Sequence, residues 1–460
     1  MSRSAPAAPA RGALVLFTRD LRVRDHQALL AATREHDVVL PAFVLDRDLL
    51  AGSCGAPNRV AFLLDCLRDL DRSLQERGAR LILREGDVVE EAMKLVEEHS
   101  LTAIHMSADS TPYAQARRKR LEQACDRARV KLCCHPGVTV HAPGKITPAG
   151  GDHYRVFTPY WRVWSRRDPG EAMRAPRNIS MPTRSVDLRP IPTLESLVQK
   201  SPSPELQPGG EEAGRRQLGR WLGHADAYEE LHDDLPAAGT SRLSAYLHFG
   251  CLSPRALLAR GGAAGAAEGF ARQLCWRDFH HQVLAARPDI PSHDYRPRGD
   301  RWQRDKPSTE AWREGLTGYP IVDAGMRQLA REGFMHNRAR LIVSSFLSKT
   351  LYIDWRTGAA HFARLLIDAD VANNVGNWQW VAGTGNDTRP NRVLNPIRQA
   401  HRFDPEGEYV RRYIPELAGV AGRAVHEPWK LGRARSALKY PEPLLDHEAG
   451  AAEFRARREG

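Results

Sequence analysis

The sequence predicts an α/β domain with a parallel sheet, followed by a linker and an all-helical domain. Three observations predict this fold class. Short apolar runs alternate with helical stretches at the start of the chain, a Pro- and Gly-rich stretch of poor periodicity follows, and the remainder has a helical pattern. Strand–helix alternation of this kind gives a parallel sheet with helices on both faces. We expect domains over residues 11–137 and 215–448, joined by a linker over residues 138–214.

The α/β domain is expected to contain five strands separated by helices. The predicted strands are Ala13–Thr18, Val38–Leu45, Arg80–Leu83, Thr102–Ser107 and Val130–Cys133. The predicted helices are Arg24–Arg34, Asn58–Arg77, Asp87–Glu98 and Pro112–Arg127. Such sheets often bind ligands beyond the carboxyl ends of their strands. Because no G-x-G-x-x-G motif follows the first strand, a standard dinucleotide site is not expected there.

The linker contains one aromatic island, Tyr154–Trp164, which we expect to pack against a domain rather than to stand free in solvent. Residues Ser201–Gly214 have the composition of a connecting segment on the surface. In the helical part, Gly333 is expected to end one helix, and a second helix is predicted over Met335–Lys349.

Composition restricts the class of protein. Sixty-seven Lys and Arg against 56 Asp and Glu give a net charge of +11. This charge suits a polyanionic partner, and it suits a solvated Arg-rich surface equally well. Seven Cys without a C-x-x-C pair argue against a disulfide framework or a zinc site. No apolar run approaches the roughly 18 residues of a membrane span, and the first twelve residues lack the apolar centre of a signal peptide, so we expect a cytoplasmic protein.

The stretch Asp368–Arg389 is the most unusual in the chain. It combines acidic and amide side chains with two Trp and three Gly. Carboxylates accept hydrogen bonds, Trp378 and Trp380 offer flat faces for stacking, and Gly permits close approaches that a Cβ forbids. We predict that this stretch forms the wall of a cofactor pocket, with its glycines letting the backbone turn between the two Trp.

Thr240–Ser244, which follows Gly239, has two interpretations. Hydroxyls, an Arg and backbone N–H groups at the start of a helix can bind phosphate. An ordinary N-cap, with Thr or Ser starting a helix, explains the same residues. Tyr228 lies close enough in sequence to cover such a site.

A second polar and aromatic face is predicted on the helix Gln273–His280. Gln273, Trp276, Arg277 and His280 share this face at helical spacing. With Asn337 and Arg338 nearby, such a face can stack on a base and hold a phosphate. The alternative for each residue alone is part of a capped helix or a surface cation.

From about Gly12 to His447 the chain resembles the photolyase/cryptochrome family of blue-light flavoproteins, and within it bacterial class I cyclobutane pyrimidine dimer photolyases. The resemblance rests on Asp368–Arg389 and on F-T-R-D-L-R, Y-R-V-F-T-P-Y-W-R-V-W, T-S-R-L-S, W-R-D-F, T-G-Y-P-I-V-D-A-G-M-R-Q-L and M-H-N-R, in the family's order. It implies a Rossmann-like α/β antenna domain, a long linker and a helical FAD-binding domain.

The resemblance implies a set of FAD-binding residues. Tyr228 and Thr240–Ser244 would hold the ribityl chain and phosphates, Asp368 and Asp370 would meet the flavin with Arg340 as ion-pair partner, and Asn374 would face its reactive ring nitrogen. The full set is Tyr228, Thr240, Ser241, Arg242, Leu243, Ser244, Arg340, Asp368, Ala369, Asp370 and Asn374. Plant cryptochromes usually carry Asp at the last position and insect ones Cys, so Asn favours a repair enzyme.

The resemblance also assigns tryptophans and a DNA-binding set. Trp302, Trp355 and Trp378 stand where the family has its electron relay, although the residues alone favour core packing for each. The DNA and substrate contacts would be Gln273, Trp276, Arg277, His280, Asn337, Arg338, Trp380 and Gln399. Trp276 and Trp380 would flank the flipped-out dimer. No metal is implied.

Three positions bear on substrate choice. Asn337 replaces the catalytic His of six-four photolyases, so cyclobutane dimers are the expected substrate. Gln273 stands where many dimer photolyases have Glu, and Leu341 where Met is common. An amide keeps hydrogen bonding to the bases but loses the charge-assisted bond.

The segment Asp109–Ala114 resembles that of members that bind 8-hydroxy-5-deazaflavin as antenna. Members that bind methenyltetrahydrofolate, the alternative antenna, tend to carry an Asn-Glu pair here.

The expected function is light-dependent repair of UV-damaged DNA by a monomer that needs no protein partner and no membrane. The alternatives are a cryptochrome-type photoreceptor without repair activity and a DNA-binding protein that has lost the flavin. Asn374, Asn337 and Arg338 favour the first function over the second, and the T-S-R-L-S motif with Asp368 and Asp370 opposes the third.

Overall fold

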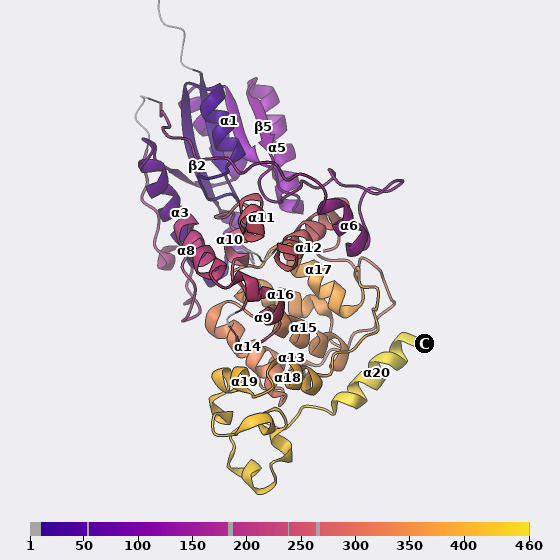
Figure 1. Cartoon of the computed structure of the whole chain (residues 1–460). Helices are drawn as coiled ribbons and strands as arrows, with labels where there is room; N and C mark the ends of the chain where they lie inside the picture. The colour runs from indigo at the N-terminus through magenta and orange to yellow at the C-terminus, as the bar shows by residue number, and fades with distance from the viewer. Residues whose placement is uncertain (1–10, 53–54, 183–186, 238, 264–266, 460) are drawn as a thin grey trace, which may run out of the picture.

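The α/β domain packs on one end of a helical domain (Figure 1). The computed structural model describes residues 11–52, 55–182, 187–237, 239–263 and 267–459. The prediction that the first twelve residues lack the apolar centre of a signal peptide falls mostly on residues 1–10, which lie outside the described residues. Within these ranges, no helix is long and apolar enough to cross a membrane.

The predicted five-stranded parallel sheet is confirmed. Its strands are β1 (Gly12–Phe17), β2 (Val38–Asp46), β3 (Ile82–Gly86), β4 (Ala103–Ser107) and β5 (Lys131–His135). They are ordered β3-β2-β1-β4-β5, and all neighbours are parallel. The predicted strand ends differ from the observed ones by at most three residues. The strand order reverses between β1 and β4, the point at which such sheets usually bind ligands.

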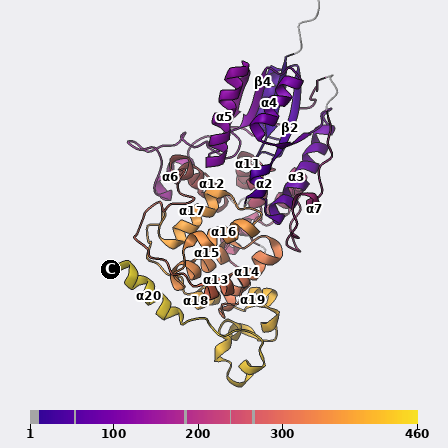
Figure 2. The same ribbon diagram turned by 180° about the vertical axis from the view of Figure 1, so that it is seen from behind.

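Helices cover both faces of the sheet, because side chains alternate between the faces along each strand. One face packs against α4 (Val88–Glu98) and α5 (Pro112–Ala128). The opposite face packs against α1 (Gln27–Glu35) and α3 (Pro57–Gln75), in a core that continues into the helical domain. Accordingly α1 lies in front of the sheet in Figure 1 and α4 in the reverse view of Figure 2. A short helix, α2 (Arg47–Ala51), follows β2.

The aromatic island of the linker packs against the helical domain, as predicted. Its residues form α6 (Phe157–Trp164), and the Phe157 ring stacks on Trp276 with centroids 3.7 Å apart and planes 2° apart. Trp164 donates its indole N–H to Asp278, 2.9 Å away. The linker also contains α7 (Leu194–Leu197). The aromatic island is therefore part of the packed structure around the cavity described below.

The rest of the described chain is helical. The helices are α8 (Glu211–Leu222), α9 (Tyr228–Leu231), α10 (Ser244–His248), α11 (Pro254–Ala263), α12 (Ala267–Ala286), α13 (Lys306–Glu314), α14 (Pro320–Glu332), α15 (Asn337–Ser345), α16 (Trp355–Leu365), α17 (Val371–Ala382), α18 (Pro396–Phe403), α19 (Glu408–Tyr413) and α20 (His447–Glu459). Gly333 ends α14 with φ 60°, as predicted. The single helix predicted over Met335–Lys349 is wrong in one respect, because α15 gives way at Phe346–Thr350 to a π-helical turn.

A buried ion-pair cluster joins the two domains at the point where strand order reverses. Arg19 follows β1 and Asp109 follows β4, and their side chains pair at 3.2 Å. Arg19 also pairs with Asp370, the N-cap of α17, and the imidazole of His281 lies 3.4 Å from the same carboxylate. Burial alone would raise the pKa of Asp370, but His281 and Arg19 hold this pKa well below its usual value. Asp370 is therefore a carboxylate whose charge is balanced from both domains.

We predict that Arg19→Met lowers the free energy of unfolding by about 3 kcal/mol, because it leaves two buried carboxylates without their partner. Urea unfolding measures the loss. Arg47→Met, which removes an exposed pair with Glu85, is the matched control and is expected to cost less than about 1 kcal/mol. Equal, small losses in the two variants would show that the cluster does not hold the domains together.

Candidate cofactor and nucleic-acid site

One cavity of about 400 Å³ opens among α10, α12, α15 and α17. Its lining unites the residues predicted for the cofactor with most of those predicted for DNA. The predicted residues that line it are Tyr228, Thr240, Ser241, Arg242, Leu243, Ser244, Gln273, Trp276, Arg277, His280, Asn337, Arg340, Asp368, Asp370 and Trp380. Residues from Tyr228 to Trp380, more than a hundred positions apart in the sequence, thus line the same cavity.

The Thr240–Ser244 segment enters α10 without a side-chain cap. The N-cap residue is Leu243, whose side chain has no acceptor, and no side chain in the described part of the chain caps the helix. The ordinary N-cap interpretation is therefore wrong. The segment faces the cavity, and Arg242 stays at its edge by pairing with Glu332 at 2.5 Å and packing over the Phe334 ring. Uncapped N–H groups next to a cation suit an anionic group such as phosphate.

Asp368 carries a free acceptor in the cavity wall. Its Oδ2 accepts from Arg340 at 2.9 Å, which is the expected ion pair. Its Oδ1 is buried without a hydrogen-bond partner among the described residues. A buried acceptor without a partner is costly, so a donor from a bound group would stabilise it. This atom, the uncapped segment and the size of the cavity fit a nucleotide-type cofactor such as FAD.

Asp370 differs from Asp368, because the protein itself satisfies its carboxylate. Its Oδ1 accepts from the backbone N–H of Asn373 at 2.9 Å and from that residue's side-chain amide at 2.7 Å. Its Oδ2 pairs with Arg19. Asp370 thus lines the cavity mainly as the cap of α17 and as the anchor of the domain contact.

The expectation that glycines turn the backbone between Trp378 and Trp380 is wrong. Both residues lie in one continuous helix, α17, which ends at Gly383 with φ 80°. Residues two apart in a helix point about 200° apart, so the helix itself directs the rings to opposite sides. The predicted close approach at a glycine is found at Gly376, where α17 lies directly against α12. A Cβ at this position would lie 2.1 Å from His280 Nδ1.

Trp378 and Asn374 lie behind the main cavity. Both line a smaller cavity of about 60 Å³, whose wall shares Asn337 and Asp368 with the main one. The side-chain amide of Asn374 donates to the carbonyl of Ala359 at 3.0 Å. The side chain of Ala369 lines neither cavity. The structure thus places Asn374 next to, but not in, the main cavity.

The three predicted relay tryptophans stand on separate elements, Trp378 on α17, Trp355 at the start of α16 and Trp302 before α13. The Trp378 ring lies against Gly358 of α16, where a Cβ would be 2.1 Å from the ring. Trp355 lies one turn earlier in α16 and is fully buried, with its indole N–H donating to Asp294 at 2.9 Å. Trp302 is half-buried and packs against Tyr352, with ring centroids 5.0 Å apart.

Trp312 is a neighbour that sequence reasoning missed. Its ring lies 6.1 Å from that of Trp378, edge to face, and its indole N–H donates to Val343 at 3.0 Å. Spacing in the sequence carries no sign of this contact, because residue 312 comes from α13. It offers a matched control for the relay.

Trp276 and Trp380 face the cavity from two helices. One face of the Trp276 ring is covered by Phe157, and Trp380 is half-buried with the Arg392 guanidinium 5.9 Å from its ring. Asn337 and Gln273 line the same cavity. This combination of aromatic faces with amides can stack a base and hydrogen-bond its edge.

Three residues of the predicted DNA set lie elsewhere or are already bonded. Arg338 packs over Phe403 and pairs with Asp233, outside the cavity lining. Gln399 lies on α18, also outside it. Arg277 is only 8% exposed, and its guanidinium donates to the carbonyl of Val138 at 2.5 Å. Its geometry suits holding the linker better than contacting DNA.

Sequence reasoning missed the groups that face Asp370. Arg19, His248 and His281 come from three separate segments and meet only in the folded chain. Arg19 belongs to the F-T-R-D-L-R motif, which supports the family resemblance but to which the sequence analysis assigns no structural role. The signal that the sequence offered was the position of Arg19, a charged residue directly after a predicted strand.

A second cleft, of about 580 Å³, adjoins the segment Asp109–Ala114. It lies between that segment, the residues after β5 and the C-terminal half of α12, and Asp109, Ser110, Val138 and Gln282 are among its lining residues. Thr111 caps α5 beside it by accepting from the Ala114 N–H at 3.3 Å.

The sequence matches two family descriptions. Residues 13–177 match the family described as DNA photolyase, and residues 270–459 match the FAD binding domain of DNA photolyase. A protein of Streptomyces griseus named deoxyribodipyrimidine photo-lyase is 51% identical over 97% of this chain and 99% of its own. The chain belongs to the DNA photolyase family. The α/β domain and the linker up to residue 177 correspond to the first match, and α12 to α20 to the second.

Solved structures of the photolyase family agree. A bacterial class III photolyase from Agrobacterium tumefaciens superposes with a TM-score of 0.92 at 32% identity, covering 100% of this chain and 99% of its own. A cryptochrome from Synechocystis superposes with a TM-score of 0.89 at 29% identity, covering 100% of both chains. Photolyases and a cryptochrome therefore share this fold, so the fold alone does not separate the two.

We predict that Gly376→Ala lowers the free energy of unfolding by about 1–3 kcal/mol, because the added Cβ forces α17 away from His280. Thermal unfolding and FAD content measure the effect. Gly219→Ala, in α8 with nothing within 4 Å of the added Cβ, is the control and is expected to stabilise by up to about 1 kcal/mol. Unchanged stability in Gly376→Ala would contradict the contact between α12 and α17.

Proposed function

We propose that this protein is a light-dependent DNA-repair enzyme that uses FAD to split cyclobutane pyrimidine dimers. One observation supports it above the others. A single cavity joins a wall suited to a nucleotide cofactor, with Asp368 and Thr240–Ser244, to Trp276 and Trp380, which suit extruded bases.

The cavity residues have separate tasks toward FAD. The backbone N–H groups of Thr240–Ser244 would hold its phosphates, and the free Oδ1 of Asp368 would accept a hydrogen bond from the flavin, with Arg340 fixing the carboxylate. Asn374 adjoins the cavity and would tune the flavin through its amide. Bound FAD supplies the light-driven electron that opens the cyclobutane ring.

The same cavity would receive the damaged bases. Photolyases are among the enzymes known to extrude a nucleotide, and paired damage stacks poorly, which lowers the cost of flipping. Trp276 and Trp380 would stack on the extruded dimer, and Asn337 and Gln273 would hydrogen-bond its edges. Asn337 cannot act as the acid that six-four repair is expected to need, so we assign cyclobutane dimers as substrate.

The relay tryptophans would supply electrons from the surface. Trp302 is half-buried, Trp355 and Trp378 are fully buried, and Trp378 lines the small cavity beside the main one, so electrons would pass in the order 302, 355, 378. Each indole N–H or ring is held by a neighbour, such as Asp294 at Trp355. Electron transfer along this route would reduce oxidised FAD. It is a separate step from the transfer of an electron from reduced FAD to the dimer.

The DNA duplex would lie across the cavity mouth. A net charge of +11 favours binding to phosphates, with a strong dependence on salt. Arg338 would contact the DNA backbone after it exchanges Asp233 for phosphate, and Gln399 on α18 would add a polar contact. We expect a cytoplasmic monomer acting without an obligate protein partner.

The second cleft is our candidate for an antenna chromophore. It combines a carboxylate, Asp109, and a hydroxyl, Ser110, with the amide of Gln282, within a volume that suits a small heteroaromatic ring system. The Asp109–Ala114 segment favours 8-hydroxy-5-deazaflavin, with methenyltetrahydrofolate as the alternative.

A cryptochrome without repair activity is the second candidate, since a cryptochrome shares the fold. The features that favour repair are Asn374 beside the cavity and the aromatic pair Trp276 and Trp380 inside it. A signalling flavoprotein has no need of a base-stacking wall next to its cofactor.

We predict that the fully reduced protein repairs cyclobutane dimers under blue or near-ultraviolet light and leaves six-four photoproducts unchanged. Chromatography of damaged oligonucleotides, illuminated and dark, measures both reactions side by side. A protein that holds FAD yet repairs neither lesion would favour the cryptochrome. A colourless protein that cannot take up FAD would exclude both flavin functions.

We predict that Trp378→Phe slows photoreduction of oxidised FAD by more than about tenfold, equivalent to about 1.4 kcal/mol of barrier, because Phe is harder to oxidise than Trp. Repair by pre-reduced enzyme is expected to stay unchanged. Trp312→Phe is the control, because its ring touches Trp378 without lying on the outward route. Equal slowing in both variants, or equal loss of repair and photoreduction, would contradict the relay.

A further inference from the structure

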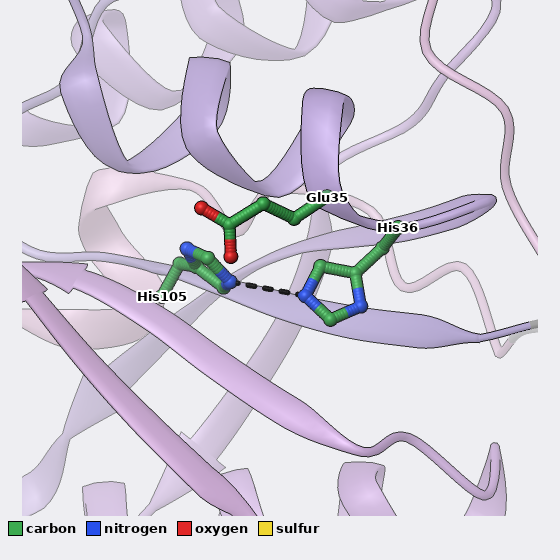
Figure 3. A group of neighbouring side chains, drawn as sticks. All are labelled: Glu35, His36 and His105. Atoms are coloured by element: carbon green, nitrogen blue, oxygen red, sulfur yellow. Dashed lines mark hydrogen bonds between the residues drawn. The ribbon is translucent and has the colours of Figure 1, made fainter.

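Three imidazoles and one carboxylate meet in the α/β domain, outside the three cavities described above. Glu35 is the last residue of α1, His36 is its C-cap, His105 lies in the middle of β4 and His135 ends β5. Figure 3 shows the Glu35 carboxylate and the His36 ring directed toward His105. The proposed photochemistry uses none of these groups.

The two imidazole nitrogens lie at the spacing of metal ligands, with the Glu35 carboxylate nearby. His36 Nε2 and His105 Nε2 lie 3.2 Å apart, and one ligand atom from each of Glu35, His36 and His105 lies within 4.8 Å of the others. Zinc binds imidazole nitrogen at about 2.0–2.1 Å, so two nitrogens of a tetrahedral site are about 3.3 Å apart. The two imidazoles therefore already stand at the spacing that a shared cation would impose.

The remaining contacts of His105 fit the same interpretation. His105 is fully buried, and its second nitrogen, Nδ1, lies 3.1 Å from Nε2 of His135. Metal-bound imidazoles usually donate their other N–H to a neighbouring acceptor, which fixes the ring. His135 is placed to accept that hydrogen bond and to position His105.

Without a cation, hydrogen bonds explain the cluster less well. A chain of hydrogen bonds through His36, His105 and His135 requires one set of tautomers. It gives no role to the Glu35 carboxylate, whose remaining contact is a loose, exposed pair with Lys131 at 3.8 Å. A cation between His36 and His105 uses this carboxylate as its third ligand.

We propose that Glu35, His36 and His105 bind a divalent transition-metal ion, with Zn²⁺ as the best match and water as the fourth ligand. Two imidazoles and a carboxylate suit Zn²⁺, whereas Mg²⁺ and Ca²⁺ prefer all-oxygen sites. Glu35 is 48% exposed, which gives a path for the ion from solvent. Binding ties the end of α1 to β4, far along the chain.

Calorimetric titration of the full-length, untagged protein with ZnCl₂ tests the proposal. We expect one Zn²⁺ per chain and a higher melting temperature with Zn²⁺ present. Glu35→Gln and His36→Gln are expected to lower affinity by more than about tenfold, and His135→Gln by about 10–100-fold. His105→Gln is a weaker test, because a fully buried residue can affect folding.

Two controls separate this site from adventitious binding. His224→Gln changes an exposed His elsewhere, and Cys133→Ser changes the thiol that lies beside His105 in the strand register. Both are expected to bind Zn²⁺ as the original chain does, and zinc-edge X-ray absorption is expected to show nitrogen and oxygen ligands alone. Absence of one-to-one binding, equal affinity in Glu35→Gln and His36→Gln, or sulfur in the ligand shell would overturn the proposal.

Discussion

The contact of Arg19 with Asp370 is the interaction on which the arrangement of the molecule depends. In parallel α/β sheets, the crevice where strand order reverses usually holds a ligand. Here it receives the start of α17 from the other domain. Arg19, which also pairs with Asp109, binds Asp370, and His248 and His281 lie against the same carboxylate. The main cavity thus lies not in this crevice but among the helices that this contact orients.

The contacts at the first turn of α17 set the orientation of this helix, and therefore which side chains each of its faces presents to the cavity and to the interior. Asp370 caps the helix, and Gly376 lets it lie directly against α12. Trp380 then faces the main cavity, whereas Trp378 faces the interior and α16. A single helix can therefore serve the substrate on one side and electron supply on the other, without any break in its backbone.

The fold was largely predictable from the sequence. Most residues that line the site were also predictable, but the contacts between them were not. Apolar runs between helical stretches gave the five strands, because burial patterns are local in sequence. The π-helical turn at Phe346–Thr350 and the partners of Asp370 depend on contacts from distant segments, which no local pattern contains. The uninterrupted helix through Trp378 was not predicted, because the polar residues and glycines of this stretch interrupt the apolar pattern by which a helix is recognised in a sequence.

The central claim is that opposite faces of α17 separate the damaged base from electron supply. A crystal structure of the protein with FAD and a duplex containing one thymine dimer tests it most directly. The account predicts the extruded dimer between Trp276 and Trp380, with Trp378 on the far side of the helix, against α16 and without contact to the DNA. A dimer stacked on Trp378, or one bound outside the cavity, would contradict it.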